Sequence, residues 1–309
     1  MSIVIITIPG SAQKEFVNSL HKETQGGVAL VIIQSPRRYT LLERASRFYR
    51  RTGFPGIFIE AWYALLLRLN PQVRSALGYF QVPHASLEED YLPPIMWADS
   101  VNGDAAYKAL AAISPDMLAV WGSAILEPRI VATAKMAVNL HFGHSPQYRG
   151  ALANQHAVLN REYALVGATI HHMRDTVDGG DIVEQLTLDL SLPPHQAFPA
   201  FTRRVRQRFV EVLKRLHEGE DLPVRRQDTR NSNILLLRQW LPSLRYAVGK
   251  RILALEKAYP TYVQPKRTKY RLAVAALIAA ALSGGGYALA SGFLDTPHPG
   301  VGCADSPKA

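Results

Sequence analysis

The amino-acid sequence predicts an α/β fold built around a mostly parallel β-sheet. Ser2–Ile8 is a continuous apolar run rich in β-branched residues, as expected of a strand that is covered on both faces. A helix is predicted over Gln13–Lys22, with Ser11 as its N-cap, and Val28–Ile33 is a second apolar strand. A strand, a helix and another strand in this order indicate a parallel sheet. The sequence has no GxGxxG pattern, so the dinucleotide-binding fingerprint is absent.

The alternation of helices and strands resumes after residue 100. Helices are predicted over Gly103–Ile113, Glu127–Thr133, Leu152–Asn160 and Phe201–His217, and strands over Met117–Trp121, Met136–Leu140, Ala164–His172 and Gly180–Leu188. Asn231–Tyr259 is expected to be helical in pieces, interrupted at Pro242. Residues 37–78 are expected to form an insertion of two helices, one of them amphipathic and rich in arginine. This pair packs on the sheet in one interpretation and touches a membrane surface in the other.

The composition is that of a globular protein. Of 309 residues, 48% are hydrophobic and 19% are charged, which excludes an intrinsically disordered chain. The single cysteine, Cys303, excludes an internal disulfide framework, so the folded part is expected to lie in a reducing, cytoplasmic compartment.

The net charge of +10 is concentrated in one segment. Residues 196–271 carry 18 Lys/Arg and 6 Asp/Glu, a net charge of +12, so the remainder of the chain carries −2. A basic segment of this kind is typical of proteins that bind nucleic acid or an anionic membrane surface.

An apolar segment follows the basic one. Leu272–Leu294 runs for 23 residues without a charge, which is long enough to cross a bilayer. Four basic residues within 266–271 precede it and only Lys308 follows it, so the N-terminal bulk is expected on the cytoplasmic side. Its high content of Ala and Gly, with an interruption at 283–286, leaves a buried or loosely attached helix as the alternative. The N-terminal apolar run is short and lacks a basic leader, so no signal peptide is expected.

The stretch at residues 139–150, NLHFGHSPQYRG, carries the clearest chemistry. Side chains alternate across a strand, so Asn139 and His141 should project from the same face. At the carboxyl end of a parallel strand this face opens to the crevice where such sheets bind ligands. An amide that donates and an imidazole that can also move a proton suit a reaction in which negative charge develops on a carbonyl oxygen.

A carboxylate would complete this pair. The segment 174–181, RDTVDGGD, offers three aspartates in a glycine-containing loop between two predicted strands, and Asp178 is the best placed by pattern. The glycines indicate a tight backbone path that can approach a ligand. Taken singly, an Asn or a His on a strand is more often structural than catalytic, and an Asp in a glycine turn is usually turn chemistry. The combination is more specific than its members.

Four stretches together resemble the folate-dependent formyltransferases. They are SVNGDAAYKALAAISPDMLAVWGSAIL (100–126), NLHFGHSPQYRG (139–150), GATIHHM (167–173) and DTVDGGDIVEQ (175–185). The family comprises methionyl-tRNA, phosphoribosylglycinamide and amino-sugar formyltransferases and the formyltetrahydrofolate hydrolases. The resemblance is dense from about Ser100 to Gln185 and weaker over the first strands. It implies a Rossmann-like formyltransferase fold.

The resemblance also implies a site and a co-substrate. The catalytic set falls on Asn139, His141 and Asp178: the first two stabilise the oxyanion as an amine attacks the formyl carbon, and the aspartate fixes the histidine and helps to move protons. The implied formyl donor is 10-formyltetrahydrofolate. Its pterin-like ring would be held by residues of a strand end and of the loop that closes over it, namely Gly122, Ile125, Leu126, Asp175, Thr176 and Val177. Acceptor contacts are expected from His144, Tyr148 and Arg149.

The sequence departs from the family pattern on the acceptor side. The family motif usually has His-x-Ser-Leu-Leu-Pro, whereas here it is HFGHSP at 141–146. Gly143 stands where Ser is expected, and His144 and Ser145 replace two apolar residues, which leaves the acceptor open. A metal site is not expected, because the histidines at 141, 144, 171 and 172 have poor geometry for one ion. His171 is expected instead to be a packed, hydrogen-bonded residue of the sheet.

Three domains and three functions follow from these observations. We expect a catalytic domain at 1–189, a basic helical extension at 190–265, and a membrane anchor with a short tail at 266–309. An N-formyltransferase acting on an amino sugar, nucleotide- or lipid-linked, is favoured, at the inner face of the cytoplasmic membrane. Methionyl-tRNA is the second acceptor, although its enzymes usually add a C-terminal β-barrel. A formyltetrahydrofolate hydrolase and a non-catalytic, membrane-held binding module are the alternatives.

Overall fold

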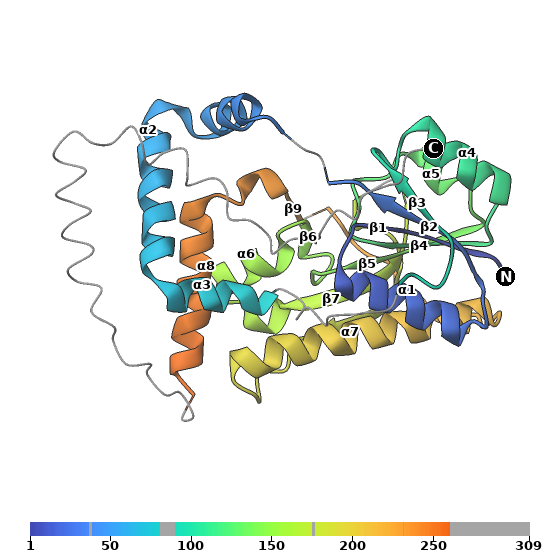
Figure 1. The fold of residues 1–309 in the computed structure, drawn as a ribbon. Coiled ribbons are helices and arrows are strands. Elements are labelled where there is room, and N and C mark those ends of the chain that lie inside the picture. The colour runs from blue at the N-terminus through green and yellow to red at the C-terminus, as the bar shows by residue number, and fades with distance from the viewer. Residues whose placement is uncertain (37–38, 81–89, 175–176, 231, 260–309) are drawn as a thin grey trace.

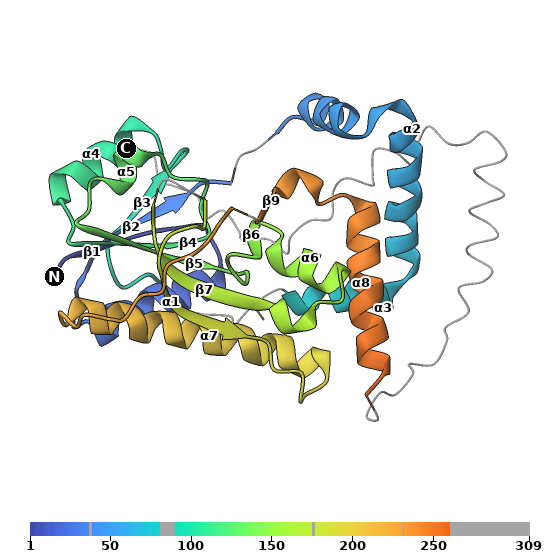
Figure 2. The same cartoon turned by 180° about the vertical axis from the view of Figure 1, so that it is seen from behind.

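The computed structural model describes residues 1–36, 39–80, 90–174, 177–230 and 232–259 (Figures 1 and 2). Its centre is a seven-stranded sheet in the order β3-β2-β1-β4-β5-β7-β8. These strands are β1 (Ile3–Thr7), β2 (Val28–Gln34), β3 (Ile95–Ala98), β4 (Met117–Trp121), β5 (Met136–His141), β7 (Gly167–His172) and β8 (Ile182–Thr187). Strands β1 to β5 are parallel, and β7 and β8 are antiparallel to their neighbours. The predicted mostly parallel α/β sheet is confirmed.

Helices cover the sheet on both sides, which explains why every residue of β1 is buried. One face packs against α1 (Ser11–Glu23), α6 (Ala153–Leu159) and α7 (Pro194–His217), and the other packs against α4 (Asp104–Ile113) and α5 (Pro128–Val131). Figure 1 shows α1 and α7 on one side of the sheet and α4 and α5 on the other. The strands therefore supply apolar side chains to two separate cores.

The second core ends on β5. Its last contribution from this strand is Ala137, and the next two residues of the strand on the same face are Asn139 and His141. On the opposite face of the strand, Val138 and Leu140 belong to the larger core. Burial of Val138 and Leu140 therefore fixes β5 on one face. The other face is polar near the carboxyl end of the strand, at Asn139 and His141.

The insertion after β2 consists of α2 (Leu41–Leu69) and α3 (Pro71–Leu77), and both pack against α8 (Pro242–Lys257). Thr40 and Glu43 form a capping box at the start of α2. The helix bends at Gly53, whose φ of 65° and ψ of 176° are accessible to glycine and to almost no other residue. Figures 1 and 2 place α2 and α8 side by side, at the end of the molecule away from α4 and α5.

Two expectations from the sequence are corrected by the structure. The N-cap of α1 is Gly10, and Ser11 is the first residue of the helix. The described residues 232–259 are not purely helical, because β9 (Asn233–Leu235) precedes the short 3₁₀ helix η3 (Leu237–Gln239) and α8. Strand β9 pairs in parallel with β6 (Tyr148–Gly150) in a separate two-stranded sheet. Strands of three residues are too short to show a periodic pattern.

The chain after residue 189 shares the core of the sheet. Phe209 of α7 is fully buried and stacks on Phe16 of α1, with 5.0 Å between ring centroids. The division into domains at 189 and 265 remains a prediction. No helix within the described residues is long and apolar enough to cross a membrane. The predicted span Leu272–Leu294 lies outside the described residues.

Candidate active site

The pairing of β5 with β7 brings four polar side chains onto one face of the sheet. In this antiparallel pair Asn139 lies opposite His171, and His141 lies opposite Thr169. Directly opposed residues on two strands project to the same face, with their Cβ atoms about 5 Å apart. The face predicted to be polar from β5 alone is therefore extended by β7.

Asp178 is delivered to this face by the loop between β7 and β8. Its φ of 48° is in the left-handed region, which Asp tolerates better than most residues. Gly180 packs so closely on β7 that a Cβ atom there would lie 1.7 Å from the His172 carbonyl oxygen. A glycine is required at this point for the loop to lie against the strand. The loop glycines were expected to approach a ligand, whereas Gly180 approaches the protein's own backbone.

The Asp178 carboxylate is the common acceptor of the site. Its Oδ1 accepts a hydrogen bond of 3.2 Å from Asn139 Nδ2 and lies 3.6 Å from His171 Nε2. Its Oδ2 accepts a hydrogen bond of 2.9 Å from the Gly150 N–H and lies 3.3 Å from His141 Nδ1. The structure thus brings Asn139, His141 and Asp178 together, as the resemblance implied.

Burial and charge oppose each other at these groups. Burial alone would raise the pKa of Asp178, but His141, His171 and the Gly150 N–H outweigh it and hold the pKa well below its usual range. Burial lowers the pKa of His141, although the Asp178 charge raises it. The carboxylate is therefore ionised at neutral pH, beside an imidazole for which protonation is disfavoured by burial and favoured by its neighbour.

Both ring nitrogens of His141 face acceptors. Nε2 donates to the Tyr148 carbonyl oxygen at 3.1 Å, and Nδ1 faces the Asp178 carboxylate. A neutral imidazole has one N–H and can satisfy one of them; the protonated ring satisfies both. Gly143 makes room for this ring, because a Cβ atom at 143 would lie 2.1 Å from His141 Nε2. Gly143, which stands where the family usually has Ser, is therefore consistent with the position of the His141 ring.

The two amide hydrogens of Asn139 are used within the protein. Nδ2 contacts His171 Nε2 at 3.1 Å as well as Asp178, and His171 Nδ1 donates to the His172 carbonyl oxygen at 2.9 Å. A neutral His171 with its proton on Nδ1 accepts from Asn139, and the three contacts are mutually consistent. His171 was expected to be a packed, hydrogen-bonded residue of the sheet. Its burial and its hydrogen bonds agree with that expectation, and one of these bonds orients the Asn139 amide.

The turn after β5 is held from beneath by buried polar groups. Thr169 Oγ1 donates to the Gly143 carbonyl oxygen at 2.7 Å and accepts from the Ser145 N–H at 3.1 Å. Gln185 Nε2 donates to the Ser145 carbonyl oxygen at 2.7 Å, and its Oε1 accepts from Arg225 at 2.7 Å. These contacts hold the turn that contains Gly143, which leaves space for the His141 ring, and that leads to Tyr148, whose carbonyl oxygen accepts from the ring.

The three predicted acceptor contacts have different surroundings. His144 is half-buried, with its Nδ1 at 3.2 Å from Gln147. Tyr148 packs in the core, and its hydroxyl contacts Glu162 and Asn160, so it faces away from the site. Arg149 is 5% exposed and donates from Nη1 to the Val177 carbonyl oxygen at 2.9 Å. Its Nε is buried and has no hydrogen-bond partner among the described residues.

The predicted folate contacts lie at the carboxyl end of β4 and in the Asp178 loop. Gly122 has a positive φ of 70°, Ile125 is exposed and Leu126 is buried in the second core. Val177 is half-buried, and Asp175 and Thr176 lie outside the described residues.

The residues that hold the segment after β4 could not be recognised from the sequence. Asn102 Nδ2 donates to the Ile125 carbonyl oxygen at 2.9 Å, and its Oδ1 accepts from the Glu127 N–H at 2.9 Å. Gln34 Oε1 accepts from the Ala124 N–H at 2.9 Å. Both residues follow or end secondary-structure elements at the same edge of the sheet. The only signal for them was their place in the VNG and IIQS stretches, which is weak.

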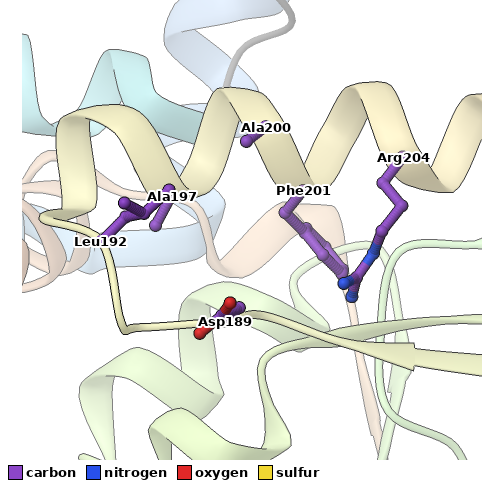
Figure 3. Close-up of a pocket in the computed structure, with 6 residues that line it drawn as sticks. All are labelled: Asp189, Leu192, Ala197, Ala200, Phe201 and Arg204. Atoms are coloured by element: carbon purple, nitrogen blue, oxygen red, sulfur yellow. The ribbon is translucent and has the colours of Figure 1, made fainter.

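A pocket on the other face of the sheet is separate from this polar cluster. It lies between α7 and the segment that follows β8, as Figure 3 shows. Its lining residues are Asp189, Leu192, Ala197, Ala200, Phe201 and Arg204. Two of them, Ala197 and Phe201, belong to the larger core on the side opposite to Asn139 and His141. This pocket carries no part of the predicted chemistry.

Comparison with known proteins relates the part of the chain that carries this arrangement to one family. The family model described as Formyl transferase matches residues 70–215, which include β5, β7 and the Asp178 loop. The resemblance to the formyltransferase family is therefore confirmed for this part of the chain.

Individual relatives match over shorter stretches. A methionyl-tRNA formyltransferase from Latilactobacillus sakei is 32% identical over 31% of this chain and 31% of its own length. One from Thermotoga neapolitana is 31% identical over 46% of this chain and 45% of its own length. The chain thus aligns with less than half the length of these relatives. Among solved structures, a sugar N-formyltransferase from a Shewanella species has a TM-score of 0.45 at 15% identity, covering 87% of this chain and 95% of the other.

Substituting Gly143 by Ala should disturb the site through His141. The new Cβ atom would also lie 2.5 Å from the Ala153 Cβ and 2.7 Å from the Tyr148 carbonyl oxygen. We expect the free energy of unfolding, measured in urea, to fall by about 1–3 kcal/mol. Gly78→Ala is the matched control, because no atom lies within 4 Å of a Cβ at that position. Equal effects of the two substitutions would contradict the assigned role of Gly143.

Replacing Asp178 by Asn should lower the pKa of His141 further. The charge that raises this pKa would be removed, while the burial that lowers it would remain. An NMR titration of the His141 ring is the measurement. Asp181→Asn is the control, because Asp181 raises the pKa of His172 instead. A His141 pKa that is unchanged or raised in Asp178→Asn would show that the carboxylate does not act on the ring.

The lowered pKa of His141 also predicts how stability changes with pH. The unfolded chain protonates this ring near pH 6.5, before the folded protein does. The contribution of His141 to stability is therefore present above about pH 6.5 and is lost as the pH falls below it.

Proposed function

We propose that the chain is an enzyme that moves a formyl group from 10-formyltetrahydrofolate to a primary amine. The observation that carries the proposal is the Asp178 carboxylate, which lies within 3.3 Å of both Asn139 Nδ2 and His141 Nδ1 at the carboxyl end of β5. The match of residues 70–215 to the formyl transferase family supports it.

The proposed reaction has a simple balance. The amine nitrogen forms a bond to the formyl carbon, the bond from that carbon to N10 of the folate breaks, and one proton passes from the amine to N10. His141, between the Tyr148 carbonyl oxygen and Asp178, is placed to take and return this proton, and Asp178 stabilises the protonated ring. Asn139 and the His141 N–H are the proposed donors to the oxygen that gains negative charge. Gly122, Ile125, Leu126 and 175–177 remain the proposed folate contacts.

For the acceptor we propose an amino sugar that carries an anionic group. Arg149 supports this choice, because its guanidinium is buried next to the Asp178 loop and its Nε has no partner among the described residues. A buried N–H without a partner is unfavourable and would be satisfied by a phosphate or carboxylate oxygen. His144 is a further proposed contact. Tyr148 supports the site through its carbonyl oxygen, since its hydroxyl points away.

Methionyl-tRNA is the second candidate acceptor. It is favoured by the similarity of the chain to methionyl-tRNA formyltransferases and by the net charge of +12 over residues 196–271. Binding of tRNA through this segment would neutralise phosphates and would weaken steeply with salt. An amino sugar with one anionic group would show a much shallower dependence.

The test measures tetrahydrofolate release by the full chain with 10-formyltetrahydrofolate and a panel of acceptors. The panel contains nucleotide-linked and lipid-linked amino sugars, methionyl-tRNA, and no amine. Release only with an amino sugar supports the proposal, and release only with methionyl-tRNA favours the second candidate. Release without an amine indicates a hydrolase. Binding of the folate without release in any mixture indicates a non-catalytic binding module.

Variants then connect the activity to the site. Asp178→Asn and His141→Gln should lower kcat/KM by about 10²–10⁴-fold, the usual contribution of acid–base catalysis. Asp189→Asn, an exposed aspartate in the pocket of Figure 3, is the matched control and should leave the activity unchanged. Full activity of Asp178→Asn, with folding verified by circular dichroism, would refute the assignment.

We further propose that Leu272–Leu294 anchors the catalytic part to the inner face of the cytoplasmic membrane. The support is in the sequence: 23 residues without a charge after a basic stretch. Cys303, the single cysteine, follows the proposed span and gives a direct test. A maleimide that cannot cross the membrane should label it from outside intact cells. Labelling only after the cells are lysed would place the tail inside and contradict the orientation.

A further inference from the structure

The outer side of α2 after its bend is apolar and exposed. Phe54, Phe58 and Trp62 follow one another at intervals of four residues, so they lie along one stripe of the helix. Their exposed fractions are 66%, 64% and 50%, and Ile59 beside them is 54% exposed. Phe54 and Phe58 meet edge to face with 5.4 Å between ring centroids. Large apolar side chains gathered in this way are typical of an interaction surface.

The inner side of the same helix is already occupied. Glu60 is buried and accepts hydrogen bonds of 2.8 and 2.6 Å from Ser243 at the start of α8. Tyr63 lies 5.7 Å from the ring of Tyr246, and Leu67 is buried. This part of α2 is therefore apolar on most of its circumference while only one side packs on the protein. A helix with this pattern is expected to be covered on its other side as well.

The first part of α2 adds positive charge. Arg44, Arg47, Arg50 and Arg51 lie in the three turns before Gly53, against the single acidic residue Glu43. Arg50 and Arg51 are exposed and stand three or four residues before Phe54. Leu41 and Leu42 of the same part are 65% and 83% exposed. Arginines next to exposed aromatic and aliphatic side chains are the composition of helices that lie in the headgroup region of a bilayer.

The charge distinguishes among the candidates that could cover this surface. A second copy of the chain would bring the same arginines face to face. The apolar segment Leu272–Leu294 has no charged residue to pair with them. A nucleic acid would meet the arginines but would leave Leu41, Leu42 and the aromatic stripe without an apolar environment. A bilayer with anionic headgroups meets both needs, because each basic residue near it contributes about 1 kcal/mol and the apolar side chains enter the acyl boundary.

The position of α2 in the fold agrees with such a contact. In both views α2 is at the end of the molecule away from α4 and α5, with α8 on its inner side (Figures 1 and 2). Residues 258–271 connect α8 to Leu272–Leu294, and a chain of this length can extend up to about 50 Å. The two segments can therefore reach the same bilayer, and stable attachment usually needs two such contacts.

We propose that the outer side of α2, from Leu41 to Trp62, is a docking surface for an anionic lipid bilayer. The contact involves Leu41, Leu42, Phe54, Phe58, Ile59 and Trp62, with the arginines at the level of the headgroups. It is independent of the formyl-transfer site and of the proposed anchor.

The test uses the full chain and a probe that reports only on α2. Cys303→Ser with Phe58→Cys allows one environment-sensitive fluorophore to be attached at position 58. Cys303→Ser with Trp97→Cys is the matched control, since Trp97 is 53% exposed on β3, far from α2 in Figure 1. Each labelled protein is mixed with vesicles of phosphatidylcholine alone or with phosphatidylglycerol. A quencher attached to the acyl chains shows whether the label enters the bilayer.

We expect a blue shift and quenching at position 58 with phosphatidylglycerol vesicles and none at position 97. Arg50→Glu with Arg51→Glu, or added salt, should remove the shift, because surface charges are screened within about 10 Å at 0.1 M salt. A label at 58 that stays in water while the chain sediments with the vesicles would overturn the proposal, with the anchor alone responsible. A blue shift without vesicles would also overturn it, because it would indicate that the chain itself or a second copy covers this surface. A shift produced by tRNA and not by vesicles would overturn it as well.

Discussion

The site depends on one buried carboxylate and the donors that surround it. The side chain of Asp178 is 13% exposed, and withdrawing a carboxylate from water costs several kcal/mol unless hydrogen bonds replace the water. Here the replacements come from β5 through Asn139 and His141 and from β6 through the Gly150 N–H, while His171 of β7 holds the Asn139 amide in place. Because each donor satisfies the same two oxygens, the three strands and the loop must keep their relative positions for any of these contacts to exist.

Two glycines make this arrangement sterically possible. Gly180 lets the Asp178 loop lie on the backbone of β7, and Gly143 leaves the space that the His141 ring occupies. Neither has a positive φ, so the requirement is for absence of a side chain and not for an unusual backbone. Glycine loses more conformational entropy on folding than any other residue. At these two positions that cost is offset by close contacts that a residue with a Cβ atom could not make.

The sequence predicted the parts of the site that depend on local pattern. Alternation on β5 was sufficient to place Asn139 and His141 on one face, and the apolar runs were sufficient to identify the parallel strands. The contact with Asp178 could be expected only from the family resemblance, since it joins residues 37 or more positions apart. His171 was expected to be packed and hydrogen-bonded, but no local pattern could indicate that Asn139 is its partner. Tyr148 was expected at the acceptor, but its hydroxyl turns inward to Glu162, a partner that no local pattern indicates.

The contacts of His141 and Asn139 bear on the role of each residue in the proposed formyl transfer. The N–H groups of both already donate to protein acceptors: Tyr148, Asp178 and His171. If the carbonyl oxygen of the formyl group replaced one of these acceptors, the net gain in free energy would be the difference between the new hydrogen bond and the lost one. This difference is small while the oxygen is neutral and larger once the oxygen carries negative charge. Donation would then favour the charged intermediate over the ground state, which is the condition for catalysis. Protonation of His141, in contrast, adds a donor towards Asp178 without breaking the bond to Tyr148. The surroundings of this ring therefore favour proton transfer as its main role, with donation to the oxygen limited to the moment when negative charge develops.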